Sequence, residues 1–472
     1  MIRGGTIRTV GYVVTMGLGA AIAAFMLRGL GVDEFGRYAT VAALLAIVST
    51  LSDTGSTAIG TRELSLRPPG PQRKSLIQDL IAIRILLAGA GLALALVFAV
   101  IVGYDRTLIA GVLIGGIGVL LVNTQAMMMV PLSIDLRVGS ITVIEIAKSV
   151  ITLLGVAALA TAGASLLPYF AVQILAGFGA LALTPVFVGS FTQLRPKLRR
   201  SEAISLMREA IPIGIALAMN VLYLRLLVVI VSLTTGKTAT GLYGTAFRVV
   251  ELFVGIPPIV IGVALPLLAV AGAEDLDRLR YGAERLLETA VVASMGLALV
   301  VTALAEPTLR LLGGGEQYVG ATRLLQTQIW ALVPLAAGNV IGMMLLSLRR
   351  LRDIALSNAL ALAVVLTVGL GLISVYGGEG AAVTGLIAES TLLLSSIAFL
   401  AAAQRSFLPR LRVVWRPLIA LAAGLATMLL PLSPAIDGLV AATVFCAVAF
   451  AIGAVPREIL EALRRRAPGD RS

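Results

Sequence analysis

Long apolar stretches, separated by short polar segments, recur along almost the whole chain. Splitting the sequence at clusters of charged residues, glycine and proline gives fourteen stretches of about the length that crosses a bilayer, roughly 20 residues. Their expected boundaries are 8–30, 38–59, 79–102, 107–130, 139–161, 166–190, 211–234, 242–270, 288–311, 321–346, 354–376, 381–403, 413–431 and 438–455. The pattern predicts an all-α, polytopic membrane protein with about fourteen transmembrane helices.

The distribution of basic residues predicts the orientation of these helices. The chain has 37 Lys and Arg against 25 Asp and Glu, a net charge of +12. With the N-terminus inside, most basic residues fall on inner segments, above all on the loop 195–208. Positively charged loops stay in the cytoplasm, so we expect an even number of spans and cytoplasmic termini. The first apolar stretch is too long for the core of a secretory signal, and we expect an uncleaved helix.

Composition excludes most soluble-enzyme chemistry. Hydrophobic residues make up 58 % of the chain and charged residues 13 %, whereas soluble domains carry about 25 % charged residues. The absence of His removes the usual proton relay and the commonest metal ligand. Cys446 is the single cysteine, so no disulfide within the chain and no cysteine metal site is expected. We expect no cofactor, no metal and no nucleic-acid partner, and we expect membrane lipids around the chain.

A short internal repeat predicts two related halves. Gly36-Arg37-Tyr38 and Gly241-Leu242-Tyr243 stand 205 residues apart, at the outer starts of the second and eighth predicted spans. Transporters are commonly built from two related helical bundles. We therefore expect two pseudo-symmetric bundles and a terminal helix pair. The predicted parts are an N-terminal lobe of six spans (1–200), a C-terminal lobe of six spans (201–405), the helix pair (406–456) and a basic cytoplasmic tail (457–472).

Several motifs resemble those of a known family. Residues 28–38 read RGLGVDEFGRY, and residues 51–55 read LSDTG and are followed by Arg62-Glu63. Two further motifs are Gly241-Leu242-Tyr243 with Ala246, Arg248, Glu251 and Pro257, and the segment 313–318 followed by Ala321. These motifs resemble those of bacterial polysaccharide biosynthesis proteins, the oligosaccharide-lipid flippases of the multidrug/oligosaccharidyl-lipid/polysaccharide (MOP) exporter superfamily. The resemblance covers most of residues 1–405. It implies a two-lobed, fourteen-helix flippase that passes a polyprenyl-diphosphate-linked saccharide from the inner to the outer leaflet.

Charged residues within the predicted spans are the candidate functional residues. Each costs about 2.5–3.5 kcal/mol at a helix centre on insertion scales, so such residues usually line a cavity or pair with each other. The set is Arg28, Asp53, Arg84, Glu145, Lys148, Arg225, Arg248, Glu251 and Glu389. Glu145 with Lys148, and Arg248 with Glu251, have the i, i+3 spacing at which opposite charges neutralise each other. Arg28 lies near the outer end of its span and can extend to the interface. For these five residues a structural role is favoured.

Arg225 and Arg84 have no acidic residue three or four positions away on their own helices. The planar guanidinium matches a diphosphate, because it can bind two oxygens at once. We hypothesise that Arg225 and Arg84, with Arg28 and Arg248, line a cationic central cavity between the lobes. The alternative is an ion pair between helices, with Asp53 or Glu389 as the acidic partner.

Glu389 and Asp53 are the candidate ion-coupling residues. A carboxylate at membrane depth can be protonated at ordinary pH, so either residue could couple transport to H⁺ or Na⁺. The alternative is a fixed counter-ion for Arg84 or Arg225.

The leading hypothesis is a flippase of the cell membrane that moves a lipid-linked oligosaccharide by alternating access, for cell-surface polysaccharide synthesis. It makes and breaks no bond and is not an enzyme, and polysaccharide-assembly machinery is the class of protein partner we would look for. One alternative is an ion-coupled multidrug/cation antiporter of the same superfamily, which a cavity dominated by carboxylates would favour. Another is a membrane-embedded glycosyltransferase or polymerase, which needs a catalytic acid or metal site and usually a long external loop.

Overall fold

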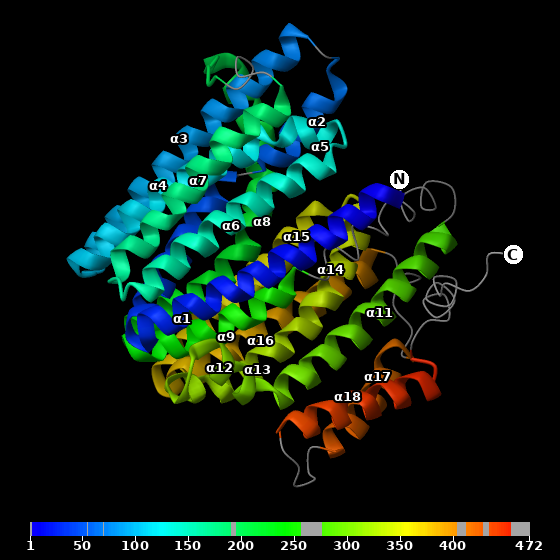
Figure 1. The fold of residues 1–472 in the computed structure, drawn as a ribbon. Helices are drawn as coiled ribbons and strands as arrows, with labels where there is room; N and C mark the ends of the chain where they lie inside the picture. The colour runs from blue at the N-terminus through cyan, green and yellow to red at the C-terminus, as the bar shows by residue number, and fades with distance from the viewer. Residues whose placement is uncertain are drawn as a thin grey trace, which may run out of the picture. The chain divides into compact units, whose positions relative to one another are not determined.

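The chain folds into α-helices joined by short turns (Figure 1). The computed structural model describes residues 2–53, 55–68, 70–189, 195–255, 276–403, 412–427 and 434–454. Within these ranges there is no β-strand, and the predicted all-α fold is confirmed.

The helices follow one another along the chain with few residues between them. In order they are α1 (Ile2–Asp53), α2 (Ser56–Leu66), α3 (Pro71–Ile101), α4 (Arg106–Met128), α5 (Val130–Ile134), α6 (Val138–Thr161), α7 (Leu166–Val188), α8 (Arg200–Thr234), α9 (Lys237–Val254), α11 (Leu276–Ala303), α12 (Ala305–Gly313), η2 (Glu316–Ala321), α13 (Thr322–Gln328), η3 (Ile329–Ala331), α14 (Leu332–Ser347), α15 (Leu351–Val364), η4 (Val365–Gly369), α16 (Leu370–Ala403), α17 (Arg412–Thr427) and α18 (Pro434–Ala451).

Each of the fourteen predicted spans lies, in whole or in part, on one of these helices. Eight helical stretches are long and apolar enough to cross a membrane, by length and composition. Two of the eight, Gly11–Asp53 and Leu351–Ala403, each correspond to two predicted spans. A glycine outside helical geometry divides each of them: Gly31 with φ 70° and Gly377 with φ 57°. Positive φ favours glycine because it has no Cβ. The last part of the eighth predicted span, with Pro257, lies outside the described residues.

Several helices begin well before the apolar stretch that predicted them. The spans expected from residues 79, 211 and 288 lie on helices that begin at Pro71, Arg200 and Leu276. Hydropathy marks the part of a helix at membrane depth, whereas the backbone hydrogen bonds continue into the polar region. The extra turns are therefore polar extensions of the same helices.

The chain divides into two compact units, which are described separately. Unit 1 comprises the described residues of Met1–Thr245 and Leu312–Gln317, and unit 2 those of Ala246–Leu311 and Tyr318–Ser472. In unit 1, α4 packs on α7, and α1 packs on α6 and α8. In unit 2, α11 packs on α14, α17 and α18, and α16 packs on α14 and α15. The lobes predicted from the sequence, with their division at residue 200, stay a prediction.

Candidate functional site

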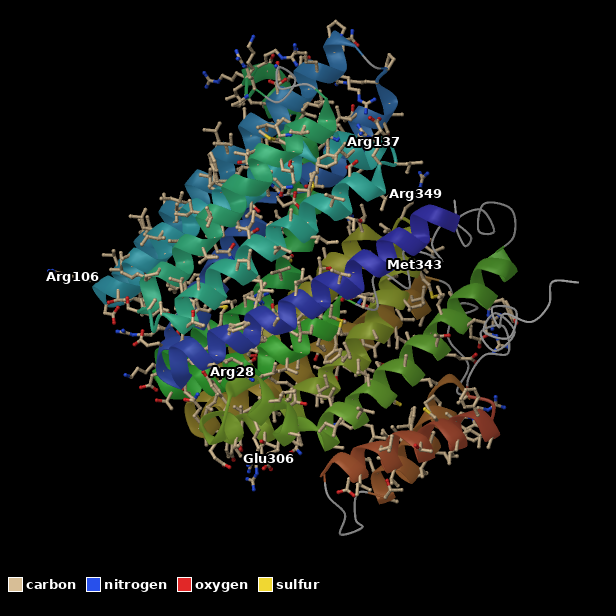
Figure 2. All side chains as sticks on the ribbon, viewed as in Figure 1. Arg28, Arg106, Arg137, Glu306, Met343 and Arg349 are labelled. Carbon is tan, nitrogen blue, oxygen red and sulfur yellow. The ribbon has the colours of Figure 1, made fainter. Side chains whose placement is uncertain are left out.

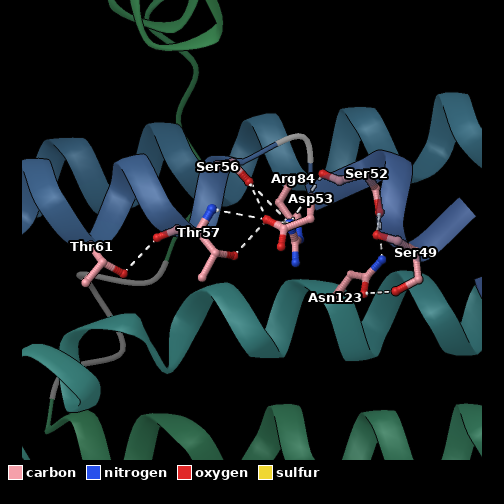
Figure 3. A network of polar contacts seen from close by, with 8 residues as sticks. All are labelled: Ser49, Ser52, Asp53, Ser56, Thr57, Thr61, Arg84 and Asn123. Carbon is pink, nitrogen blue, oxygen red and sulfur yellow. Dashed lines mark hydrogen bonds and ion pairs between the residues drawn. The ribbon is translucent and has the colours of Figure 1, made fainter. Parts of the chain in front are cut away.

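A buried ion pair joins the end of α1 to α3 in unit 1 (Figure 3). Nη1 of Arg84 donates to Oδ1 of Asp53 at 2.5 Å, to Oγ of Ser56 at 3.2 Å and to the carbonyl oxygen of Ser52 at 3.4 Å. The Arg84 side chain is 5 % exposed, and that of Asp53 is 36 % exposed. Of the two roles considered for Arg84, these contacts support the ion pair between helices, with Asp53 as its acidic partner.

The start of α2 supplies further donors to the same carboxylate. The backbone N–H of Thr57 donates to Oδ1 of Asp53 at 3.1 Å, and the Thr57 hydroxyl donates to it at 2.8 Å. The Ser56 hydroxyl lies 3.3 Å from the same oxygen. The first N–H groups of a helix have no partner within the helix, and the helix dipole there favours a negative charge. The local chain therefore holds Asp53 ionised and in place.

A serine and asparagine network extends this site to α4. Nδ2 of Asn123 donates to Oγ of Ser52 at 2.7 Å, and Oγ of Ser49 donates to Oδ1 of Asn123 at 2.8 Å (Figure 3). Asn123 is 4 % exposed and Ser52 is 1 % exposed. None of these three residues was among the predicted site residues, because uncharged polar side chains do not stand out in a chain rich in Ser and Thr.

The ion pair leaves one donor over. Nε of Arg84 is buried and has no hydrogen-bond partner among the described residues. A buried donor without a partner is costly, about 1–3 kcal/mol, unless another acceptor reaches it. The site can therefore offer an N–H to an oxygen of a bound molecule, although Asp53 balances the charge of its guanidinium.

The two pairs predicted at i, i+3 spacing are present. Arg248 and Glu251 of α9 lie 3.2 Å apart, and Lys148 and Glu145 of α6 lie 2.5 Å apart. The Arg248 side chain is 41 % exposed.

The remaining predicted residues lie on three other helical segments. Arg28 is exposed on α1 (Figure 2), and its aliphatic part lies beside Gly314. Arg225 is half-buried on α8 and acts electrostatically on the buried Tyr243 of α9. Glu389 of α16, in unit 2, is 2 % exposed. Their roles in binding or coupling stay predictions.

A second buried carboxylate ties the basic loop to α3. Asp79 is fully buried and accepts from the backbone N–H of Arg199 at 2.7 Å, from its Nε at 3.0 Å and from its Nη2 at 2.5 Å. These hydrogen bonds and the charge of Asp79 raise the pKa of the Arg199 guanidinium. Sequence reasoning missed this pair because the Arg-rich loop was explained by topology alone. The signal was an acidic residue at the inner end of a span that faces such a loop.

The comparisons with known proteins give both a family and a fold. The family described as "Polysaccharide biosynthesis protein" matches residues 1–271, more than half of the chain. The chain belongs to this family. No curated protein sequence gives a significant match.

Solved structures share the fold over most of the chain. The lipid II flippase MurJ, in an inward closed conformation, has a TM-score of 0.75 at 12 % identity, covering 98 % of this chain and 100 % of its own. A MATE multidrug transporter of the MOP superfamily, facing inward, has a TM-score of 0.66 at 10 % identity and covers 85 % of this chain and 98 % of its own. An outward-facing MATE transporter has a TM-score of 0.58 at 12 % identity, covering 86 % and 95 %. At these identities the likeness shows the fold alone, which is that of membrane transporters and flippases of this superfamily.

Proposed function

We propose that the chain moves a polyprenyl-diphosphate-linked oligosaccharide from the inner to the outer leaflet of the cell membrane, for the synthesis of a cell-surface polysaccharide. The family match over residues 1–271 is the observation that carries the proposal. It is supported by a fold shared over 98 % of the chain with a protein named as a lipid II flippase. Transport of this kind makes and breaks no bond, so the chain acts as a transporter with cytoplasmic termini and not as an enzyme.

The diphosphate is the part of this cargo that the membrane opposes most, because it carries negative charge. Arginines at membrane depth can compensate for that charge. Arg225, half-buried in the middle of α8, is the first candidate because its planar donors match two phosphate oxygens. Arg84 contributes through its remaining Nε donor, while Asp53 keeps its guanidinium in place. Arg28 and Arg248 are the further members of the proposed cationic path.

Glu389 is our candidate for ion coupling. Its side chain is buried in α16, so a change of its protonation or the binding of Na⁺ would alter a charge within the membrane. Asp53 is the weaker candidate, since Oδ1 of its carboxylate already accepts from Arg84 and from the start of α2.

Complementation tests the proposed role of Arg225. In a host that lacks the chain, we expect the unmodified protein to restore surface polysaccharide and to clear lipid-linked saccharide from the inner leaflet. Arg225→Ala should lose this activity and Arg225→Lys should keep part of it, because Lys supplies the charge without the planar donors. Arg310→Ala is the matched control, since Arg310 of α12 is 48 % exposed and pairs with Glu306 at i, i+4. Full activity of Arg225→Ala at normal membrane insertion would remove Arg225 from the proposal.

A multidrug/cation antiporter is the second candidate, favoured by the likeness to MATE transporters. It predicts that expression of the chain raises resistance to lipophilic cations in a manner that depends on H⁺ or Na⁺. The first proposal predicts no change in resistance and a defect in surface polysaccharide on deletion.

A further inference from the structure

The internal repeat of 205 residues is longer in the structure than in the printed motif. Both copies begin with a glycine of positive φ, 70° at Gly31 and 86° at Gly236. Both then carry a threonine whose hydroxyl donates to a glycine carbonyl four residues earlier, at 3.0 Å in the first copy and 2.7 Å in the second. The equivalent pairs are Gly31 and Gly236, Gly36 and Gly241, Tyr38 and Tyr243, and Thr40 and Thr245. The chain therefore builds the same turn and helix start twice.

The two copies touch each other within unit 1, and they do so reciprocally. A Cβ added at Gly36 would collide with the carbonyl oxygen of Lys237, and a Cβ added at Gly241 would collide with the carbonyl oxygen of Val32. Lys237 is the equivalent of Val32 in the second copy, so exchanging the copies turns one contact into the other. Such reciprocity is the property of a two-fold interface. A local pseudo-two-fold axis therefore passes through this crossing.

The crossing depends on small residues that let two backbones approach closely. Gly36 and Gly241 are buried, and a Cβ at Gly244 would lie 2.8 Å from the Cβ of Ala39, its equivalent in the first copy. Close approach at small residues is how transmembrane helices associate without large apolar side chains. A single added methyl group on either glycine would thus separate the two backbones.

An exposed polar contact closes the same crossing at its edge. Oδ1 of Asp33 accepts from the Thr238 hydroxyl at 2.6 Å, and Oδ2 lies 2.9 Å from Nζ of Lys237. The side chains of Asp33 and Lys237 are 44 % and 57 % exposed. Exposed ion pairs are worth about 0–1 kcal/mol, so this contact can break and re-form easily.

The crossing lies at the end of unit 1 that the charge pattern places outside. Arg28 and Arg106, both assigned to outer ends, lie towards one end of the helices of unit 1, and Arg137, assigned to an inner loop, lies towards the other (Figure 2). The crossing follows Arg28 directly on α1.

We propose that this crossing, residues 32–39 against 237–244, is an outer gate that separates and re-forms in every transport cycle. It joins the starts of the second and eighth spans, which belong to the two predicted halves. Two halves that alternate around a two-fold axis must part on the side where cargo leaves. The inference rests on the proposed function only in that cargo leaves on the outer side. The geometry points to glycines that permit tight closure and to a weak ion pair that permits opening.

Disulfide cross-linking tests whether the gate must open. Asp33→Cys with Thr238→Cys, in a chain whose single natural cysteine is replaced by Cys446→Ala, should cross-link under a mild oxidant. We expect the cross-linked protein to stop flipping the lipid-linked saccharide in proteoliposomes and a reductant to restore it. Transport that continues in the cross-linked protein would show a permanent contact, and a pair that fails to cross-link would refute the contact itself.

A matched pair serves as the control. Arg73 and Asp135 also form an exposed ion pair at 2.9 Å, and both lie within the first predicted lobe. Arg73→Cys with Asp135→Cys should cross-link and leave transport unchanged.

A labelling experiment reads the gate without any cargo, so that failure of the proposed function and failure of the gate are distinguishable. Thr240→Cys in the Cys446→Ala chain reports on the crossing, because Thr240 is 0 % exposed. Adding Gly36→Ala should raise its labelling by an external, membrane-impermeant maleimide several-fold. Gly17→Ala should not, because a Cβ at Gly17 meets nothing within 4 Å. Both substitutions favour helix by about 1 kcal/mol, so helix propensity cannot produce the difference. Equal labelling of the two variants would overturn the proposal.

Discussion

Removing Asp53 should destabilise the protein more than removing Arg84, although the two side chains form one ion pair. Asp53→Ala leaves a guanidinium that is 5 % exposed without its counter-ion. Breaking a buried pair in this way costs about 3–5 kcal/mol. Because Asp53 is itself 36 % exposed, water reaches one side of the pair, and we expect the lower end, about 3 kcal/mol.

Arg84→Met has a smaller expected cost. The carboxylate of Asp53 keeps the N–H and hydroxyl of Thr57 as donors, and its exposed side keeps water. The loss is then close to that of a hydrogen bond to a charged group, about 1.5–3 kcal/mol, with Met filling most of the vacated volume. In Asp53→Ala with Arg84→Met no charge is left buried, so the double variant should be more stable than Asp53→Ala alone.

Equilibrium unfolding in mixed micelles, followed by circular dichroism, measures these free energies, and the four proteins form a double-mutant cycle. Glu306 and Arg310, an exposed i, i+4 pair with side chains 42 % and 48 % exposed, supply the control cycle, in which each change should stay within about 0.5 kcal/mol. If the two single variants at the buried pair lose equal stability and the double variant loses their sum, Arg84 is not held by Asp53 and our account of this site is wrong.

Three further results follow from the same structure. Arg199→Ala should destabilise the inner end of α3 more than Asp79→Ala, because it leaves a fully buried carboxylate behind, and proteolysis of the loop before α8 should report the difference. Gly118→Ala should cost about 1–3 kcal/mol of unfolding free energy, because its Cβ would press on the backbone of α7, whereas Gly89→Ala, whose Cβ meets nothing within 4 Å, should be neutral or stabilising. Glu389→Gln should abolish the dependence of transport on an H⁺ or Na⁺ gradient, and unchanged ion dependence would exclude Glu389 as the coupling residue.

The membrane architecture was predictable because one physical term dominates it. Burying apolar helices in lipid needs about 20 apolar residues at a time, and that length is visible in the sequence at every span. Helix ends were less predictable, as at Pro71 and Arg200, since a helix can continue in water where hydropathy no longer marks it. The division of α1 at Gly31 coincided with the gap between two predicted spans.

The candidate site was predictable in its residue types and only partly in its contacts. Spacing along one helix revealed Arg248 with Glu251, because i, i+3 neighbours meet in any helix. Arg84 and Asp53 are 31 residues apart on different helices, so their pairing depends on tertiary packing and stayed one of two alternatives. The outer crossing was visible as a repeated tripeptide, but only the positions of the backbones show that the two copies touch.

Direct measurement of flipping by the purified chain tests the central claim. Proteoliposomes would carry a polyprenyl-diphosphate-linked oligosaccharide in both leaflets, and an external glycosidase would first digest the outward-facing half. We predict that the saccharide from the inner leaflet then becomes digestible at a rate proportional to the amount of protein. Digestion no faster than in protein-free liposomes, together with ion-driven transport of a lipophilic cation by the same preparation, would contradict the account.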